Sequence, residues 1–254
     1  MHIKDEGDRQ RMTEAALEKR GFTTTLNLAL DSTAPERSAE TLHRKQLARF
    51  SKWLYRTGFV PGTAGNLSVR LSDELILATP TGMSKFLLKP GDMVLIGLDG
   101  CKVAGPRNVT SEIGMHLAIY NQRADVRAVV HAHPPIATGF ASCGLGLEEP
   151  LCSEVVMALG SVPLAPYATT GTCGVASSIA PLIVDHDAIL LSNHGVVTAG
   201  ATLQDAFMRM ETVEHFAHIC LVARQLGGAK PLCPEQLLEL AAARSRYLKN
   251  TGGA

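Results

Sequence analysis

The sequence predicts a single-domain, layered α/β fold in which helices pack on a central sheet. The chain has 254 residues, of which 46% are hydrophobic and 19% charged, a globular composition long enough to bury one full core. Segments with strand character alternate with segments of helical spacing, and several strands are close enough in sequence to form hairpins. Neither an internal repeat nor an interdomain linker interrupts this order. A mixed α/β layer is therefore favoured over strict βαβ winding.

The charge balance and the apolar runs argue against two classes of partner. Lysine and arginine number 24, as do aspartate and glutamate, and no basic stripe stands out, so nucleic acid is not expected to bind. Apolar runs such as Ile179–Val184 and Ala188–Leu191 are far too short to span a membrane, and the N-terminus has no apolar signal region. Six cysteines without metal-binding spacing favour a reduced, cytoplasmic setting.

The first helix of the domain follows an N-terminal extension. Residues 1–37 are rich in charge, serine and threonine, so we expect an appendage that is either partly disordered or packed on a neighbour, with a short helix over Thr13–Arg20. The domain itself is predicted over residues 38–250. Ser38 is the expected N-cap of its first helix, and Gly58 the residue that ends it.

Hairpin strands and polar loops come next. Strand-like alternation predicts strands over 66–71, 75–78 and 93–98. A loop of small residues, 61–66, precedes the first strand, and a second polar loop, 79–83, follows the second. These loops are short and rich in glycine, threonine and proline, which is typical of tight turns between strands.

A helix and a buried strand form the middle of the chain. Thr110 and Ser111 are predicted to cap a helix over Glu112–Asn121. The β-branched run Val126–Val130 is typical of a buried strand, and a short helix is expected beyond Pro135. Between residues 155 and 164 the pattern leaves strands and strand–helix fragments open.

The last third is predicted to contain one more buried strand and two long helices. Residues 171–184 are expected to be partly helical, with a break at a proline. The run 188–193 is typical of a second buried strand. Helices are then predicted from Thr202 to the glycines at 227–228, and from Pro234 to Tyr247.

Three histidines at strand ends form the chemical centre of the sequence. Side chains two residues apart in a strand share a face, so His131 and His133 are expected to project together. An isolated pair can be purely structural, and a metal site needs a third ligand. His194 supplies one, because it also follows a buried strand and precedes Gly195. The three predict a tripod for zinc with an open position for substrate. The other histidines, including His116, are interpreted as structural or exposed.

A carboxylate and an anion site complete the constellation. Glu112 is the candidate acid–base residue, although an acid in the first turn of a helix can simply complement the helix dipole. Loops 62–66 and 79–82, joined by Thr110 and Ser111, offer hydroxyl groups and backbone N–H groups for a phosphate, without a strong positive charge. Each loop alone is more often a turn. No P-loop pattern occurs, which disfavours a nucleoside triphosphate.

These motifs, in this order, resemble those of the class II aldolase/adducin family. The matching segments are Gly62–Arg70, Thr79–Met83, Ser111–Glu112, His131–His133 and Asn193–Gly195. Within the family they are most similar to the branch that acts on L-fuculose 1-phosphate. The resemblance covers about residues 38–247. It implies a largely antiparallel sheet flanked by helices, and a homotetramer with active sites at subunit interfaces.

The resemblance also implies roles for single residues. His131, His133 and His194 match the family's zinc ligands, and Glu112 matches an acid–base residue that also approaches the metal. Another divalent cation, such as Mn²⁺ or Co²⁺, could replace zinc. The phosphate pocket corresponds to Thr63, Asn66, Thr81, Gly82, Thr110 and Ser111.

Two positions depart from the pattern of that branch. Glu154 falls where it has a catalytic tyrosine, and Thr170 falls where it has a phenylalanine. Tyr247 matches a C-terminal tyrosine that closes over a neighbouring subunit's site, so Glu154 and Tyr247 are the further catalytic candidates. The departing positions touch the aldehyde half of the substrate in that branch. The three-carbon half is expected to be retained.

The implied activity is zinc-dependent cleavage of a ketose 1-phosphate to dihydroxyacetone phosphate and an aldehyde, through a metal-stabilised enediolate. Same-fold epimerases, dehydratases and decarboxylases remain alternatives, although the epimerases tend to carry aspartate at the position of Glu112. A non-catalytic interaction protein of the adducin kind is disfavoured, because that branch lacks the full histidine set.

Overall fold

The computed structural model describes residues 34–250, with side chains for residues 37–243. Most of the expected extension over residues 1–37, including the helix predicted at Thr13–Arg20, lies outside the described residues. The first described helix, α3, begins at Ala34 rather than at Ser38. Pro35 explains the earlier start, because a proline is favourable in the first turn of a helix.

A single mixed sheet forms the centre of the described chain. Its strand order is β4-β3-β2-β1-β5-β8-β7-β6, and every neighbouring pair is antiparallel except β6 and β7. The largely antiparallel sheet implied by the family resemblance is therefore confirmed. The strands are β1 Asn66–Arg70, β2 Leu75–Ala78, β3 Val94–Gly97, β4 Lys102–Ala104, β5 Ala128–Ala132, β6 Leu164–Ala165, β7 Ala188–Leu191 and β8 Gly195–Gly200.

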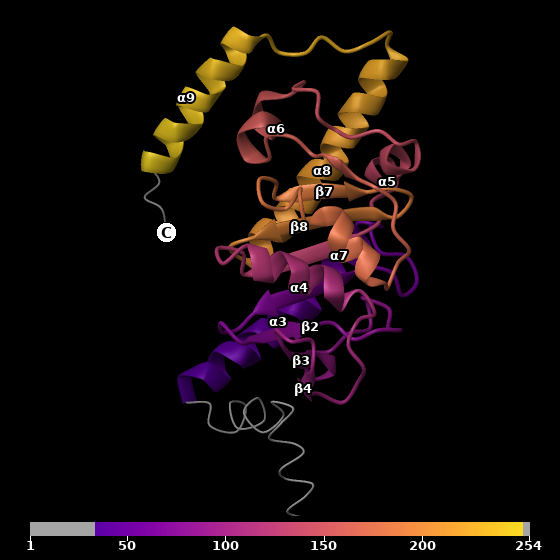
Figure 1. The fold of residues 1–254 in the computed structure, drawn as a ribbon, viewed down its shortest axis with the longest axis vertical. Coiled ribbons are helices and arrows are strands. Elements are labelled where there is room, and N and C mark those ends of the chain that lie inside the picture. The colour runs from indigo at the N-terminus through magenta and orange to yellow at the C-terminus, as the bar shows by residue number, and fades with distance from the viewer. Residues whose placement is uncertain (1–33, 251–254) are drawn as a thin grey trace, which may run out of the picture.

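Helices cover both faces of this sheet, as an αβα layering requires. Helices α4 and α7 lie on one face and α3, α5 and α8 on the other, while α9 extends away from the body and packs on α6 (Figure 1). None of the described helices is long and apolar enough to cross a membrane. The helices are α3 Ala34–Arg56, the 3₁₀ turn η1 Pro90–Asp92, α4 Ile113–Gln122, α5 Pro135–Ser142, α6 Ser153–Ala158, α7 Cys173–Ile179, α8 Leu203–Gln225 and α9 Pro234–Asn250.

The alternation of strand side chains divides the interior into two apolar layers. On β5, Val130 packs with α3 and α8, whereas Val129 packs with α4 and α7. His131 therefore shares the α4 face with Val129. Burying each aliphatic side chain in these layers contributes about 1.5–3 kcal/mol, so both layers fix the strand on which the histidine lies.

Strand β8 is the main element that the sequence did not predict. Its sequence, GVVTAG, begins and ends with glycine and resembles a turn followed by a short apolar run. In the structure all six residues are buried, because β8 pairs with β5 on one side and β7 on the other. Strand β7 correspondingly ends at Leu191, before the predicted limit of 193. The open region 155–164 forms the end of α6 and the start of β6.

Candidate active site

Antiparallel pairing brings the three strand-end histidines to one end of the sheet. Asn66, which begins β1, lies opposite His131 on β5, and Ala132 lies opposite Val196 on β8. His194 occupies the turn that joins β7 to β8, next to the end of β5. Residues far apart in sequence therefore meet where β1 starts and β5 ends.

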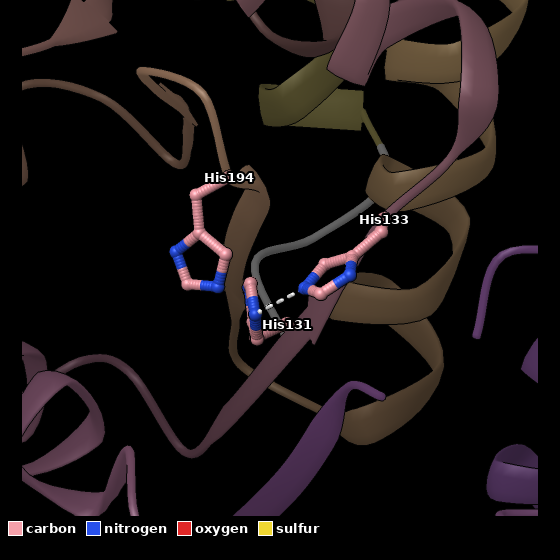
Figure 2. A group of neighbouring side chains, drawn as sticks. All are labelled: His131, His133 and His194. Atoms are coloured by element: carbon pink, nitrogen blue, oxygen red, sulfur yellow. Dashed lines mark hydrogen bonds between the residues drawn. The ribbon is translucent and has the colours of Figure 1, made fainter. Parts of the chain in front are cut away.

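The three imidazole rings converge on one point (Figure 2). The ring centroid of His131 lies 4.9 Å from that of His133 and 4.6 Å from that of His194, and the last two are 5.0 Å apart. One nitrogen from each ring lies within 4.8 Å of the others, the only group of metal-ligating side chains this close among the described residues. The predicted tripod is thus assembled within one chain.

Hydrogen bonding prepares His131 to bind a cation. Its Nδ1 donates to the carbonyl oxygen of Val196 at 2.9 Å, which orients the ring and leaves Nε2 facing the other histidines. This Nε2 faces the Nε2 of His133 at 3.0 Å. Burial, together with the neighbouring His131 and His194, lowers the pKa of His133 to about 3, so the ring of His133 is neutral. Neutral imidazole is the form that ligates a metal.

The β7–β8 turn needs two unusual backbone positions. Asn193 has a φ of 54°, in the left-handed region that asparagine tolerates, and His194 N–H donates to the carbonyl of Leu191 at 3.0 Å. A Cβ on Gly195 would lie 2.6 Å from Cδ2 of His133. Glycine is therefore required for the close approach of the turn to the second histidine.

Glu112 lies directly against this histidine cluster. Its Oε2 is 3.3 Å from Nε2 of His131, its Oε1 is 3.1 Å from Nε2 of His194, and the amide of Asn66 donates to Oε2 at 2.8 Å. The N-cap of α4 is Glu112 itself, so the prediction that Thr110 and Ser111 cap this helix is wrong. The carboxylate makes no capping hydrogen bond because it is turned toward the histidines.

The charge state and the unused oxygen of Glu112 suit a divalent cation. Burial would raise the pKa of this carboxyl group, but the adjacent His131 and His194 outweigh burial and hold the pKa well below its usual range. Oε1 is buried and has no hydrogen-bond partner of good geometry among the described residues. Three imidazoles and a carboxylate form a donor set typical of zinc and similar divalent cations.

The two predicted anion-binding loops and the Thr110–Ser111 segment meet beside the cluster. Pro80 forms a bridge with Val109, and Thr81 N–H donates to the carbonyl of Asn108 at 3.1 Å. Thr63, Thr81, Gly82 and Ser111 are exposed, and Asn66 is buried beside Glu112. Thr110 is buried, and its hydroxyl accepts the N–H of Glu112 at 3.3 Å. All six predicted anion-site residues thus lie on these connected segments.

Lys85 is a cation that the sequence interpretation missed at this site. Only 1% of the residue is exposed, and its ammonium group donates to the carbonyls of Thr63 and Met83, both at 3.0 Å. It therefore joins the two loops, and burial lowers its pKa to about 8. The available signal was a lysine two residues after the Thr79–Met83 loop, directly before the apolar run Phe86–Leu88.

The remaining candidates, Glu154, Tyr247 and Thr170, lie on segments outside the histidine cluster. Glu154 is exposed in the first turn of α6, which packs against α8 and α9, and no hydrogen bond or ion pair joins it to the histidines within the described part of the chain. Tyr247 lies in α9, beyond the described side chains. Thr170 is exposed, and the adjacent Gly171 lies close to Ser111, since a Cβ there would be 3.8 Å from it.

Comparison with known families agrees with the geometry. The pattern of the class II aldolase and adducin N-terminal domain matches residues 45–221. This segment contains every strand of the sheet and all the residues of the histidine cluster.

Similar proteins differ in the reactions their names describe. A 5-deoxy-D-ribulose 1-phosphate aldolase of Bacillus thuringiensis is 34% identical over 78% of this chain and 93% of its own. A 3-oxo-tetronate 4-phosphate decarboxylase of Escherichia coli is 35% identical over 80% of this chain and 95% of its own. A solved L-fuculose 1-phosphate aldolase is 34% identical, with a TM-score of 0.73 over 79% of this chain and 94% of that one.

Proposed function

This chain belongs to the class II aldolase and adducin family, and we propose that it is a zinc-dependent lyase that cleaves a ketose 1-phosphate into dihydroxyacetone phosphate and an aldehyde. The observation that carries this proposal is the position of Glu112, whose two oxygens face His131 and His194 at 3.3 and 3.1 Å. A carboxylate held against three convergent imidazoles can move a proton at the carbon beside a polarised carbonyl group.

In the proposed reaction, the cation would polarise the ketone and the side chains of the protein would move the proton. A divalent cation, Zn²⁺ or alternatively Mn²⁺ or Co²⁺, would supply Lewis acidity toward the ketone oxygen. Cleavage breaks the bond between carbons 3 and 4, leaves its electron pair on the three-carbon fragment, and converts the carbon-4 hydroxyl to an aldehyde with loss of its proton. We assign Glu112 to the proton at carbon 3. Its carboxylate form suits removal of that proton in the reverse, bond-forming direction.

We assign the connected loops to the substrate phosphate. Thr63, Thr81, Gly82, Thr110 and Ser111 offer hydroxyl and backbone N–H groups, and Asn66 has a second amide N–H beyond the one that Glu112 accepts. The ammonium of Lys85 lies beneath these loops and supplies positive charge to a site that otherwise has only dipoles.

Decarboxylation is the second candidate, because a decarboxylase is as similar to this chain as the aldolases are. A 3-oxo acid that loses carbon dioxide leaves its electron pair on the same three-carbon phosphate, so both reactions need the same histidines and the same carboxylate. They differ in the leaving fragment. Glu154 and Thr170, the positions that depart from the fuculose-phosphate branch, would meet that fragment, and we assign Glu154 and Tyr247 to it.

A substrate panel tests the proposal. L-fuculose 1-phosphate, 5-deoxy-D-ribulose 1-phosphate and 3-oxo-tetronate 4-phosphate are incubated with the protein, with and without chelator. Dihydroxyacetone phosphate, aldehyde and carbon dioxide are measured separately. We expect dihydroxyacetone phosphate and aldehyde in equal amounts, lost with chelator. Carbon dioxide without aldehyde would favour the second candidate, and no product from any compound would contradict the lyase proposal.

We further propose a cytoplasmic homotetramer whose active sites lie at subunit interfaces. Helix α9 supports this assembly, because it extends from the body (Figure 1) and leaves Leu238 72% exposed. A helix of this kind can reach a neighbouring copy. Light scattering coupled to gel filtration measures the assembly, and a monomer mass at micromolar concentration would contradict it.

A further inference from the structure

His116 is a buried histidine that lies behind the candidate active site. It is on α4, one helical turn after Glu112, and none of its surface is exposed. Its hydrogen bonds go to Asn66 and Ser68 rather than to the three clustered histidines. The sequence interpretation treated it as structural or exposed, and its position in the hydrogen-bond pattern indicates a more specific role.

A continuous chain of hydrogen bonds joins His116 to Glu112. Nε2 of His116 lies 2.6 Å from Oδ1 of Asn66, and the amide nitrogen of Asn66 lies 2.8 Å from Oε2 of Glu112. On the other side, Nδ1 of His116 lies 2.7 Å from the hydroxyl of Ser68, which lies 2.8 Å from the hydroxyl of Tyr120. Asn66 and Ser68 are alternate residues of β1, so both side chains face α4.

Only one direction of donation is consistent along this chain when Glu112 is ionised. A carboxylate can only accept, so Asn66 must present its N–H₂ group to Glu112 and its oxygen to His116. Nε2 of His116 must then carry a hydrogen. Burial lowers the pKa of His116 to about 3, so the ring is neutral and Nδ1 accepts from Ser68.

The hydrogen bond between Ser68 and Tyr120, at the other end of this hydrogen-bond chain, agrees with this direction of donation. Because Ser68 donates its hydrogen to His116, its oxygen must accept from Tyr120. Burial raises the pKa of Tyr120, so its hydroxyl keeps the hydrogen that it donates. His116, Ser68 and Tyr120 therefore each have a partner with the correct direction of donation, as buried polar groups in native proteins generally do.

We propose that His116 is a positioning residue for the acid–base carboxylate, acting through Asn66. The Nε2–H group of His116 holds the oxygen of the Asn66 amide, which directs the amide N–H at Glu112 and fixes the carboxylate against the histidine cluster. If the amide turned over, its oxygen would face the carboxylate and repel it. The proposal rests on the proposed function, in which Glu112 handles the proton at carbon 3.

Asn66 is well suited to this task because its bond does not compete with a cation. The imidazole nitrogens that face Glu112 are the same nitrogens available to a metal ion, so they cannot serve both partners. The amide N–H of Asn66 is a donor and cannot ligate a cation. Its bond to Glu112 can therefore hold the carboxylate whether or not a metal is bound. His116 is what keeps that donor pointed at the carboxylate.

The tautomer of His116 gives a test that needs no substrate. In ¹⁵N-labelled zinc-loaded protein, imidazole ¹⁵N shifts report which ring nitrogen carries the hydrogen, and the His116→Gln spectrum identifies the signals. We expect hydrogen on Nε2 and none on Nδ1. The opposite tautomer, or a doubly protonated ring, would overturn the direction of the chain and with it the proposal.

A comparison of variants tests positioning. Glutamine can donate to Asn66 and accept from Ser68 as the neutral ring does, whereas phenylalanine fills the space without either bond. We expect His116→Phe to lower kcat roughly 10–100-fold, the usual cost of removing a group that orients a metal-site residue, and His116→Gln to recover most of it. When Asn66→Ala is already present, adding His116→Phe should lower kcat by less than about twofold, because His116 acts only through Asn66.

Cobalt spectra separate this proposal from the proposed function. The visible absorption of Co²⁺-loaded protein responds to groups around the metal, and turnover is not required. We expect the His116→Phe and Asn66→Ala spectra to match each other and to differ from that of the unsubstituted protein. If no substrate of the panel reacts, the proposed function fails. The His116 tautomer and the cobalt spectra then still show whether His116 positions Glu112 through Asn66. An unchanged His116→Phe spectrum, or equal kcat losses in both backgrounds, would overturn the positioning role.

Discussion

The histidine end of the sheet and the outer segment formed by α6 and α9 hold their polar side chains in opposite ways. At the histidine end, Glu112 is 13% exposed at its side chain and contacts three polar partners within 3.3 Å. In the outer segment, Glu154 is exposed, and the main packing partner of α9 among the described residues is α6. One region is fixed by its own chain, and the other lies open.

This difference suggests how a family of lyases can share one reaction centre and accept different leaving fragments. Groups that stabilise developing charge are most effective when their orientation is fixed before the reaction. Under the proposed function, we therefore assign the enediolate half of the reaction to the fixed region. We assign the leaving fragment, aldehyde or carbon dioxide, to the open region, where this sequence also departs from the fuculose-phosphate branch. The following predictions test that division.

The largest effect is expected when the tripod is broken. In His194→Ala, two imidazoles remain, so we expect the metal to be lost and turnover to fall to the level of chelator-treated protein, roughly a thousandfold or more. Metal content is measured on purified protein. His218→Ala is the matched control, because His218 is exposed on α8. Full metal content in His194→Ala would remove His194 from the site.

The next largest effect is expected at Glu112, the proposed acid–base residue. Glu112→Gln preserves the shape and the hydrogen bond from Asn66 but cannot move a proton, so we expect kcat to fall about 10²–10⁴-fold with the metal retained. Turnover and metal content are measured on the same sample. Undiminished turnover would exclude Glu112 from proton transfer, whereas loss of the metal would make it mainly a ligand.

The fixed region was largely predictable because its signals are local. The strand spacing of His131 and His133, and the position of His194 after a buried strand, were sufficient to expect that the three would meet. The largely antiparallel sheet was implied by the family resemblance and is confirmed. The start of the first helix was predicted one turn too late, because Ser38 was interpreted as the N-cap and the helix-start signal of Pro35 was not used.

The rest depended on partners distant in sequence. Strand β8 is a strand because β5 and β7 pair with it on both sides, not because GVVTAG has a strong strand pattern. Lys85 became part of the anion site only when the carbonyls of Thr63 and Met83 met its ammonium group. The role of His116 likewise depends on residues of β1 about fifty positions earlier, at sequence separations of 50 and 48.

A smaller effect is expected at Lys85, the charge beneath the loops. Lys85→Met removes that charge, so we expect KM for the phosphorylated substrate to rise roughly tenfold, about 1.4 kcal/mol, with a smaller change in kcat. Lys102→Met, on the exposed part of edge strand β4, is the control. An unchanged KM would limit Lys85 to joining the two loops.

The charge of Lys85 also predicts how KM and stability change with pH in the unsubstituted protein compared with Lys85→Met. Because the pKa of Lys85 is lowered to about 8, its charge is present below that pH and KM should rise above it, but not in Lys85→Met. The lowered pKa of a cation means that the unfolded chain binds the proton more tightly. Stability relative to Lys85→Met should therefore be largest above pH 10.5 and decrease as the pH falls through about 8.

The smallest effect is expected at Glu154, and it tests the division directly. Exchange of the carbon-3 hydrogen of dihydroxyacetone phosphate in D₂O needs only the fixed region, so Glu154→Gln should leave the exchange rate unchanged within about twofold. Cleavage of the full ketose phosphate should fall by less than about tenfold, well below the 10²–10⁴ of a positioned acid–base residue, because Glu154 is exposed. NMR follows both reactions on one sample. Equal losses in exchange and cleavage would place Glu154 at the enediolate carbon, and the two regions would then act as one.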